Sequence, residues 1–178
     1  MAKDRIDYAS LIRNVPDFPK PGIQFKDITT LIRDPAALRA IIDDWRQRYG
    51  SYGLTAIVGV ESRGFIFAAA LAYAMDLPFV PARKKGKLPA KTIQQEFNLE
   101  YGTDCMEMHV DSLTAGDRVL IVDDLLATGG TLEAVCSLVE QLGADIAELT
   151  FIVELPPLNG RDKLKKYPIH ALVEFMVE

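Results

Sequence analysis

Short apolar runs recur along the chain, separated by segments with helical spacing. The runs at 55–60 and 119–122 are continuous, which predicts strands covered on both faces, as in a parallel sheet. Apolar runs at 79–82 and 146–153 predict two further strands. Apolar residues alternate with others over 169–177, so the C-terminal segment is expected to form the last strand.

Helix signals lie between these strands. Asp34 followed by Pro35 is a favourable helix start, because the aspartate caps the first turn and proline fits its first position. Gly143 is expected to end a helix, since glycine readily adopts the conformation found just past a helix C-terminus. Helices are expected over roughly 5–14, 35–49, 64–75 and 131–142.

Alternating strands and helices predict one α/β domain over 1–178, with a mostly parallel central sheet flanked by helices. Two segments fall outside this pattern. Three prolines and a glycine within 16–22 predict a stiff loop, and 83–101 is polar, basic and only weakly periodic. Ligands of such sheets bind beyond the carboxyl ends of the strands, so the residues that follow each strand are the candidates for a site.

Composition excludes several classes of protein. Hydrophobic residues make up 49% of the chain and charged residues 25%, as in ordinary globular domains. The longest apolar stretch, 65–75, is shorter than the ~20 residues that span a bilayer. The charged N-terminal segment lacks the apolar core of a signal peptide. We therefore expect a cytoplasmic protein with no membrane partner. A net charge of −5 argues against general nucleic-acid binding. Cys105 and Cys136 have neither zinc-site nor disulfide spacing, and both His109 and His170 are expected to be structural.

The segment that follows the 119–122 strand has the composition of a binding loop. Asp123 and Asp124 are adjacent acids suited to the vicinal hydroxyls of a sugar. Small residues and a helix start follow, and free backbone amides at such a place cradle phosphate. A ribose 5-phosphate fits such a segment, because its hydroxyls suit the acids and its phosphate suits the amides. In the plainer interpretation the acids are only solvated and the glycines only turn the chain. The predicted phosphate loop consists of Ala127, Thr128, Gly129, Gly130 and Thr131.

This segment, VLIVDDLLATGGT, resembles the motif with which type I phosphoribosyltransferases bind 5-phosphoribosyl-1-pyrophosphate (PRPP). Other segments resemble the adenine phosphoribosyltransferase family in particular. PDFPKPGIQFKDIT at 16–29 is similar to that family's base-binding hood, here 1–33. The resemblance implies that Phe25 stacks on the purine, that the backbones of Gln24 and Lys26 read its edge, and that Ala127 also contacts adenine. Lys26 stands where some relatives carry arginine, and Gln24 replaces an apolar residue.

Two further segments resemble the parts of this family that handle pyrophosphate and catalysis. GVESRGF at 59–65 is similar to its pyrophosphate loop, and 82–102 is similar to its flexible catalytic loop, here assigned to 83–103. For Lys84 the alternative is an ordinary solvated surface. VELPPLNGRDKL at 153–164 is similar to a C-terminal segment that we interpret as structural. The resemblance implies that pyrophosphate is bound by Ser62, Arg63, Arg83, Lys84, Lys87 and Tyr101, and that the catalytic residues are Glu100, Asp123, Asp124 and Arg63.

The resemblance implies a reaction of purine salvage, in which adenine and PRPP give AMP and pyrophosphate. It also implies the type I fold, Mg²⁺ that binds with PRPP, no certain protein ligand for a metal, and a homodimer. Three alternatives remain open from the residues alone. The chain could act on another base, such as xanthine, hypoxanthine or orotate; it could be a PRPP-sensing regulator that keeps the fold; or it could be an α/β domain without chemistry.

Overall fold

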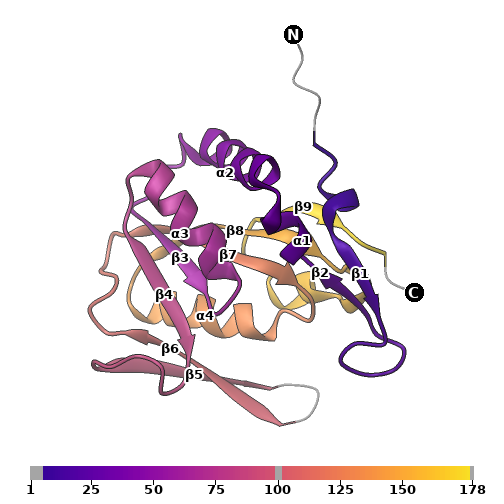
Figure 1. The fold of residues 1–178 in the computed structure, drawn as a ribbon. Helices are drawn as coiled ribbons and strands as arrows, with labels where there is room; N and C mark the ends of the chain where they lie inside the picture. Colours follow the sequence, from indigo (N-terminus) through magenta and orange to yellow (C-terminus); the bar gives the residue numbers. More distant parts are fainter. Residues whose placement is uncertain (1–5, 99–101, 177–178) are drawn as a thin grey trace.

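The computed structural model describes residues 6–98 and 102–176, which form one large sheet with helices on both faces (Figure 1). Within these residues the sheet has seven strands in the order β5-β6-β4-β3-β7-β8-β9. Strand β6 runs antiparallel to both of its neighbours, and every other adjacent pair is parallel. The mostly parallel sheet expected from the sequence is therefore confirmed. The strands are β3 (Ala56–Val60), β4 (Phe79–Lys84), β5 (Thr92–Asn98), β6 (Thr103–His109), β7 (Arg118–Leu126), β8 (Asp145–Glu154) and β9 (Ile169–Glu174).

Helices α2 and α3 cover one face of the sheet and α4 covers the other (Figure 1). In the described part of the chain, no helix is long and apolar enough to span a membrane. Short 3₁₀ turns lie at Ala9–Leu11, Pro156–Leu158 and Gly160–Lys163. The helices are α1 (Thr29–Arg33), α2 (Pro35–Tyr49), α3 (Gly64–Met75) and α4 (Gly130–Gln141).

The core is divided by the sheet, and β7 contributes to both halves. Val119 and Ile121 pack on the α4 side, whereas Leu120 and Val122 pack on the side of α2 and α3. All four side chains are fully buried. A strand covered on both faces has no position left for a polar side chain, which explains the continuous apolar run in the sequence.

Helix boundaries follow the local signals. The Asp34 carboxylate accepts hydrogen bonds from the amides of Ala36 and Ala37 at 2.8 and 3.1 Å, so it caps α2 as predicted. Gly143, one residue past the C-cap of α4, has a φ of +84°.

Of the helix expected over 5–14, the structure forms only the 3₁₀ turn Ala9–Leu11, so this expectation is wrong. The chain becomes extended at β1 (Arg13–Pro16), which pairs antiparallel with β2 (Gln24–Asp27). Pairing with β2 gives the backbone N–H and C=O groups of this segment the hydrogen bonds that a helix would otherwise supply, and Pro16 has no N–H with which to continue a helix.

Segment 83–103 contains more regular structure than its sequence pattern indicates. Strand β4 extends to Lys84, and β5 and β6 pair over their whole length from Thr92↔His109 to Asn98↔Thr103. The pattern hides β5 because Gln95, which lies on the α4 side, is polar: its Oε1 accepts from Ser137 Oγ at 3.2 Å. A polar residue at an inward position breaks the period-2 signal of a half-buried strand.

Candidate active site

The predicted phosphate loop connects the end of β7 to the start of α4 (Figure 1). Gly129 has a φ of +79°, which favours glycine, and α4 begins at Gly130, one residue earlier than the sequence predicts. Among the described residues no side chain caps this helix. The amides of its first turn are therefore available to an anion, and the macrodipole favours negative charge there.

A second segment supports this loop from behind. A Cβ at Gly129 would lie 2.6 Å from the carbonyl oxygen of Gly160, and a Cβ at Gly160 would collide with the carbonyl oxygen of Ala127. Next to Gly160, Arg161 donates from two nitrogens to the two oxygens of Glu154, each at 2.6 Å. The two glycines thus let the segments touch, and the Arg161–Glu154 pair fixes the supporting turn to the end of β8.

The two acids lie within β7 rather than after it, because the strand continues to Leu126. The side chains of Asp123 and Asp124 are nearly buried, and Asp123 Oδ1 accepts from the Asp124 amide at 2.8 Å. Burial and the neighbouring Asp124 carboxylate both raise the pKa of Asp123. A Cβ at Gly64 would come within 2.8 Å of Asp123 Oδ1, so the first residue of α3 packs directly against this acid.

Three segments meet beside these acids. Arg63, which precedes α3, forms an ion pair with Asp124, with 2.5 Å between Nε and Oδ2. Its guanidinium carbon also lies 5.5 Å from the centre of the Phe25 ring in β2. Phe18 packs edge-on against Phe25 at 5.1 Å between ring centres. The structure therefore brings Phe25, Arg63 and Asp124 together from the hood, the turn after β3 and the sheet.

The predicted base-reading residues of the hood occupy alternate faces of β2. The side chains of Gln24 and Lys26 both bond Asn14, at 2.6 and 2.9 Å, while Phe25 points to the other face. Lys26 Nζ also lies 4.6 Å from the centre of the Phe175 ring. Both polar side chains are bonded within the protein, and β2 pairs with β1 along one edge only, so backbone groups on its other edge are the part of these residues left to contact a base.

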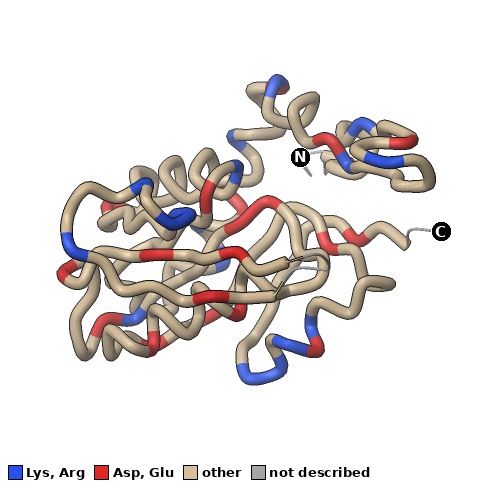
Figure 2. The backbone as a smooth tube through the Cα atoms, turned by 90° about the horizontal axis from the view of Figure 1, so that it is seen from below, with Lys and Arg blue, Asp and Glu red and all other residues tan. Residues whose placement is uncertain are grey.

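Two basic residues predicted to bind pyrophosphate are paired with acids. The Arg83 guanidinium donates to both oxygens of Glu61 at 2.9 and 3.1 Å, and to the Lys87 carbonyl at 3.0 Å. Lys84 forms an ion pair with Asp104 at 2.8 Å. Lys87 is exposed and forms no ion pair with any described residue. Figure 2 shows acidic and basic segments interleaved at this edge of the sheet.

The remaining predicted residues have simpler positions. Ser62 is exposed and follows a cis peptide bond from Glu61. Thr128 is exposed in the loop and Thr131 is half-buried in the first turn of α4. Glu100 and Tyr101 lie outside the described residues.

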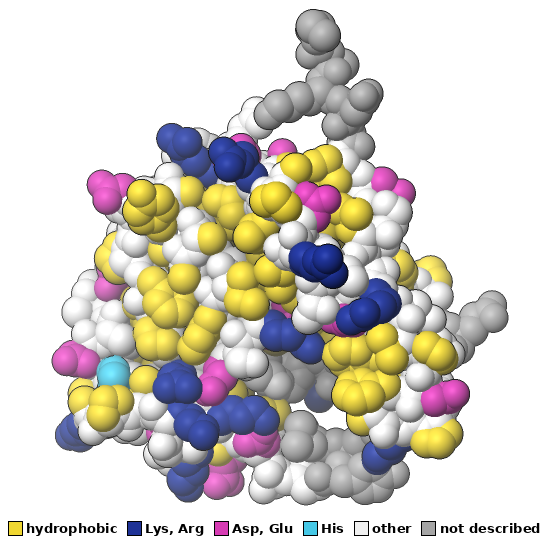
Figure 3. Space-filling model, in the orientation of Figure 1, with side chains coloured by type: hydrophobic (Ala, Val, Ile, Leu, Met, Phe, Trp, Pro, Cys, Tyr) yellow, Lys and Arg dark blue, Asp and Glu magenta, His cyan; other side chains and the backbone are white. Residues whose placement is uncertain are grey.

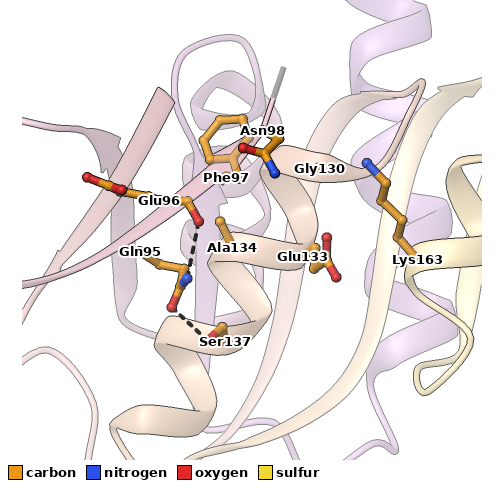
Figure 4. Close-up of a pocket in the computed structure, with 9 residues that line it drawn as sticks. All are labelled: Gln95, Glu96, Phe97, Asn98, Gly130, Glu133, Ala134, Ser137 and Lys163. Atoms are coloured by element: carbon orange, nitrogen blue, oxygen red, sulfur yellow. Dashed lines mark hydrogen bonds between the residues drawn. The ribbon is translucent and has the colours of Figure 1, made fainter. Parts of the chain in front are cut away.

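A cavity of about 470 Å³ opens between β5 and α4, beside the phosphate loop (Figure 4). Lys163 extends toward Gly130 from the supporting turn, and Glu133 lies on the exposed side of α4 (Figure 4). A Cβ at Gly130 would lie 3.7 Å from Lys163 Nζ. Positive charge is therefore present next to the start of α4.

Three residues that contact segments of the site are missing from the sequence prediction: Glu61, Gly160 and Glu107, whose Oε1 accepts from the amides of Lys87 and Leu88 at 2.9 Å. Glu107 stands between two buried methionines, and a charged residue in such a place signals a buried polar contact. Glu61 directly follows a fully buried strand, which is where site residues of parallel sheets gather. No local pattern identifies Gly160, because the loop it touches lies about thirty residues earlier in the chain.

Comparisons with known proteins show the family to which the chain belongs. A family model described as "Phosphoribosyl transferase domain" matches residues 27–171. The adenine phosphoribosyltransferase of Chloroflexus aurantiacus is 56% identical over 171 residues, covering 96% of this chain and 99% of that protein. The crystal structure of the adenine phosphoribosyltransferase of Thermoanaerobacter pseudethanolicus superposes with a TM-score of 0.91 at 48% identity, covering 94% of this chain and 98% of the other. That of Saccharomyces cerevisiae, in complex with adenine and an imino-altritol bisphosphate, gives 0.89 at 39% identity and covers 93% and 96%.

The fold and the match to the family model define the protein as a type I phosphoribosyltransferase. Within that class the chain belongs to the adenine phosphoribosyltransferase family.

Proposed function

We propose that this chain transfers the 5-phosphoribosyl group of PRPP to adenine, giving AMP and pyrophosphate in purine salvage. The observation that carries the proposal is the meeting of Phe25, Arg63 and Asp124 beside the phosphate loop. The reaction brings a flat base, a pyrophosphate and a ribose to one place. The Phe25 ring suits the base, the Arg63 guanidinium suits the pyrophosphate, and the Asp124 carboxylate suits the ribose. The yeast relative that was crystallised with adenine and a sugar bisphosphate analogue supports the same assignment.

The phosphate loop, residues 127–131, holds the 5′-phosphate through its backbone amides and the hydroxyls of Thr128 and Thr131. Asp123 and Asp124 accept hydrogen bonds from the ribose hydroxyls. Because Arg63 is paired with Asp124, PRPP binding exchanges partners: the carboxylate turns to the ribose and the guanidinium turns to the pyrophosphate.

Departure of pyrophosphate leaves positive charge on the ribose ring, so the transition state resembles an oxocarbenium ion. We assign the Asp124 carboxylate to stabilising that charge, and Arg63 and Lys87 to stabilising the negative charge that develops on the leaving group. Arg83 and Lys84 contribute less positive charge, because Glu61 and Asp104 balance theirs.

Adenine stacks on Phe25, against the Ala127 end of the loop, and the backbones of Gln24 and Lys26 read its edge. Glu100, with Tyr101 beside it, takes up the proton that adenine loses as the glycosidic bond forms. These last two roles rest on the resemblance of NLEYG to the family motif.

Mg²⁺ binds together with PRPP in this proposal. Asp123 and Asp124 offer the oxygen ligands that Mg²⁺ prefers, and no group of three His, Cys, Asp or Glu side chains suited to a metal occurs within 6–98 and 102–176. This donor set fits an ion held mainly by substrate oxygens and water. When bound, the ion neutralises charge on the departing pyrophosphate.

A homodimer is the proposed assembly, with the outer face of α3 as part of its interface. Ile66 and Tyr73 of α3 are 41% and 90% exposed. Figure 3 shows hydrophobic side chains gathered over this helix. Large exposed apolar patches mark interaction surfaces, and sedimentation of the purified chain as a monomer would contradict this assembly.

The direct test follows AMP formation from PRPP and adenine, with and without Mg²⁺. We expect AMP and pyrophosphate in equal amounts, a loss of at least tenfold in rate when the metal is chelated, and adenine to be used in preference to hypoxanthine or xanthine in competition. Preferred use of another base would correct the substrate. PRPP binding with no turnover of any base would instead favour a regulator.

A further inference from the structure

Glu107 of β6 is a buried carboxylate outside the proposed set of ligand-binding residues. Its side chain is 2% exposed, and no Lys or Arg among the described residues lies within ion-pair distance. Its Oε1 accepts from the amides of Lys87 and Leu88, both at 2.9 Å, and its Oε2 accepts from Thr92 Oγ1 at 3.4 Å and Gln94 Nε2 at 3.3 Å. A buried charge is costly unless hydrogen bonds satisfy it, and here backbone amides of a surface turn supply them.

The pKa of Glu107 reflects the same balance. Burial raises the pKa, but the hydrogen bonds from the amides of Leu88, Gly86 and Lys87 together lower it by more than burial raises it. The pKa of Glu107 therefore lies below its usual value. Glu107 therefore stays ionised at neutral pH and holds the turn 86–88 as a charged acceptor.

Lys87 is held from its other side as well. Its carbonyl oxygen accepts from Arg83 Nη1 at 3.0 Å, and Nε and Nη2 of that guanidinium donate to Glu61. Glu61 also accepts from the Lys84 amide at 3.0 Å and directly precedes Ser62 and Arg63. The backbone of Lys87 is thus clamped between a buried carboxylate and an arginine that reaches the pyrophosphate turn, while its side chain remains exposed.

We propose that Glu107 is a positioning residue, which fixes the backbone of Lys87 so that its ammonium group meets the pyrophosphate end of PRPP. This inference rests on the proposed function. Glu107 and Glu61 position the exposed Lys87 ammonium group without forming an ion pair with it. Glu107 accepts from the Lys87 amide, and Glu61 accepts from the Arg83 guanidinium, which in turn donates to the Lys87 carbonyl. Pre-organising the backbone lowers the entropic cost of bringing a flexible lysine to a ligand.

The test compares Glu107→Gln with Glu148→Gln. Glu148 is equally buried, at 3% exposed, and bonds Arg48 at 2.8 Å, away from the site. We expect Glu107→Gln to raise the KM for PRPP and the Kd for pyrophosphate by about tenfold, and to leave the KM for adenine unchanged. Glu148→Gln is expected to lower the midpoint of thermal unfolding without changing the KM for PRPP or the Kd for pyrophosphate.

A double-mutant cycle with Lys87→Met separates positioning from general loosening. If Glu107 acts through Lys87, the double variant binds pyrophosphate no more weakly than Lys87→Met alone. Additive losses would overturn the inference, and so would an unchanged PRPP KM in Glu107→Gln or in Lys87→Met. Should Glu107→Gln not fold, Glu107→Asp carries the same test, because the shorter side chain keeps the charge but withdraws it from the two amides. Wild-type protein that forms no AMP would contradict the proposed function instead, so the two failures are distinguishable.

Discussion

Asp124→Asn is expected to keep the fold and to lose turnover of PRPP and adenine by roughly 10²–10³-fold. Asparagine has the same shape but lacks the negative charge that faces the ribose in the transition state. Its amide also has one acceptor oxygen where the carboxylate has two, and its NH₂ group can only donate. Steady-state rates at saturating substrates measure the loss, since an interaction made mainly in the transition state lowers kcat.

Stability should respond differently from activity in this variant. Removing the charge of Asp124 relieves repulsion on the buried Asp123, whose pKa is raised first by burial and then by this neighbour. The ion pair that is lost involves Arg63, whose side chain is 38% exposed, and such pairs contribute little. We therefore expect an unchanged or higher midpoint of thermal unfolding. Asp145→Asn, an exposed change at the start of β8, is the matched control and should leave both quantities unaltered.

Gly129→Ala is expected to raise the KM for PRPP by more than tenfold and to change the KM for adenine little. Two costs add at this position. A non-glycine residue at a φ of +79° costs about 1–2 kcal/mol, and the new Cβ would lie 2.6 Å from the Gly160 carbonyl oxygen. The loop has to move to relieve the collision, and each ~1.4 kcal/mol of lost phosphate binding is a factor of ten in affinity.

Gly116→Ala is the matched control, because it introduces the same kind of backbone strain as Gly129→Ala without displacing the phosphate loop. Gly116 has a φ of +96°, but a Cβ there meets nothing within 4 Å. We expect it to lower the midpoint of unfolding and leave the PRPP KM unchanged. An equal rise in the PRPP KM in both variants would mean that general destabilisation, not the loop, explains the effect.

The sequence predicts the strands on either side of the site and the loop between β7 and α4 because each has a strong local signal. β3 and β7 are buried on both faces and therefore continuously apolar, and α4 has an apolar face that ends at a glycine. The β5–β6 hairpin lacks such a signal, since Gln95 and Glu107 occupy buried or half-buried positions through hydrogen bonds to other segments.

Charge in the sequence also does not reveal its partners. Arg83 and Lys84 count as free cations in a basic segment, yet their carboxylates lie about twenty residues away, at Glu61 and Asp104. Likewise Arg63 is recognisable from its place before a helix, but its pairing with Asp124 depends on the parallel register of β3 and β7. Contacts set by the topology of the sheet become visible only in the folded chain.

The most decisive measurement is a crystal structure of the protein with AMP, because the end of β7 and the loop that follows it are expected to bind the ribose and the 5′-phosphate together. We expect the phosphate to contact the amides of residues 127–131 and the ribose hydroxyls to donate to Asp123 and Asp124. A nucleotide bound elsewhere, with this turn unoccupied, would contradict it.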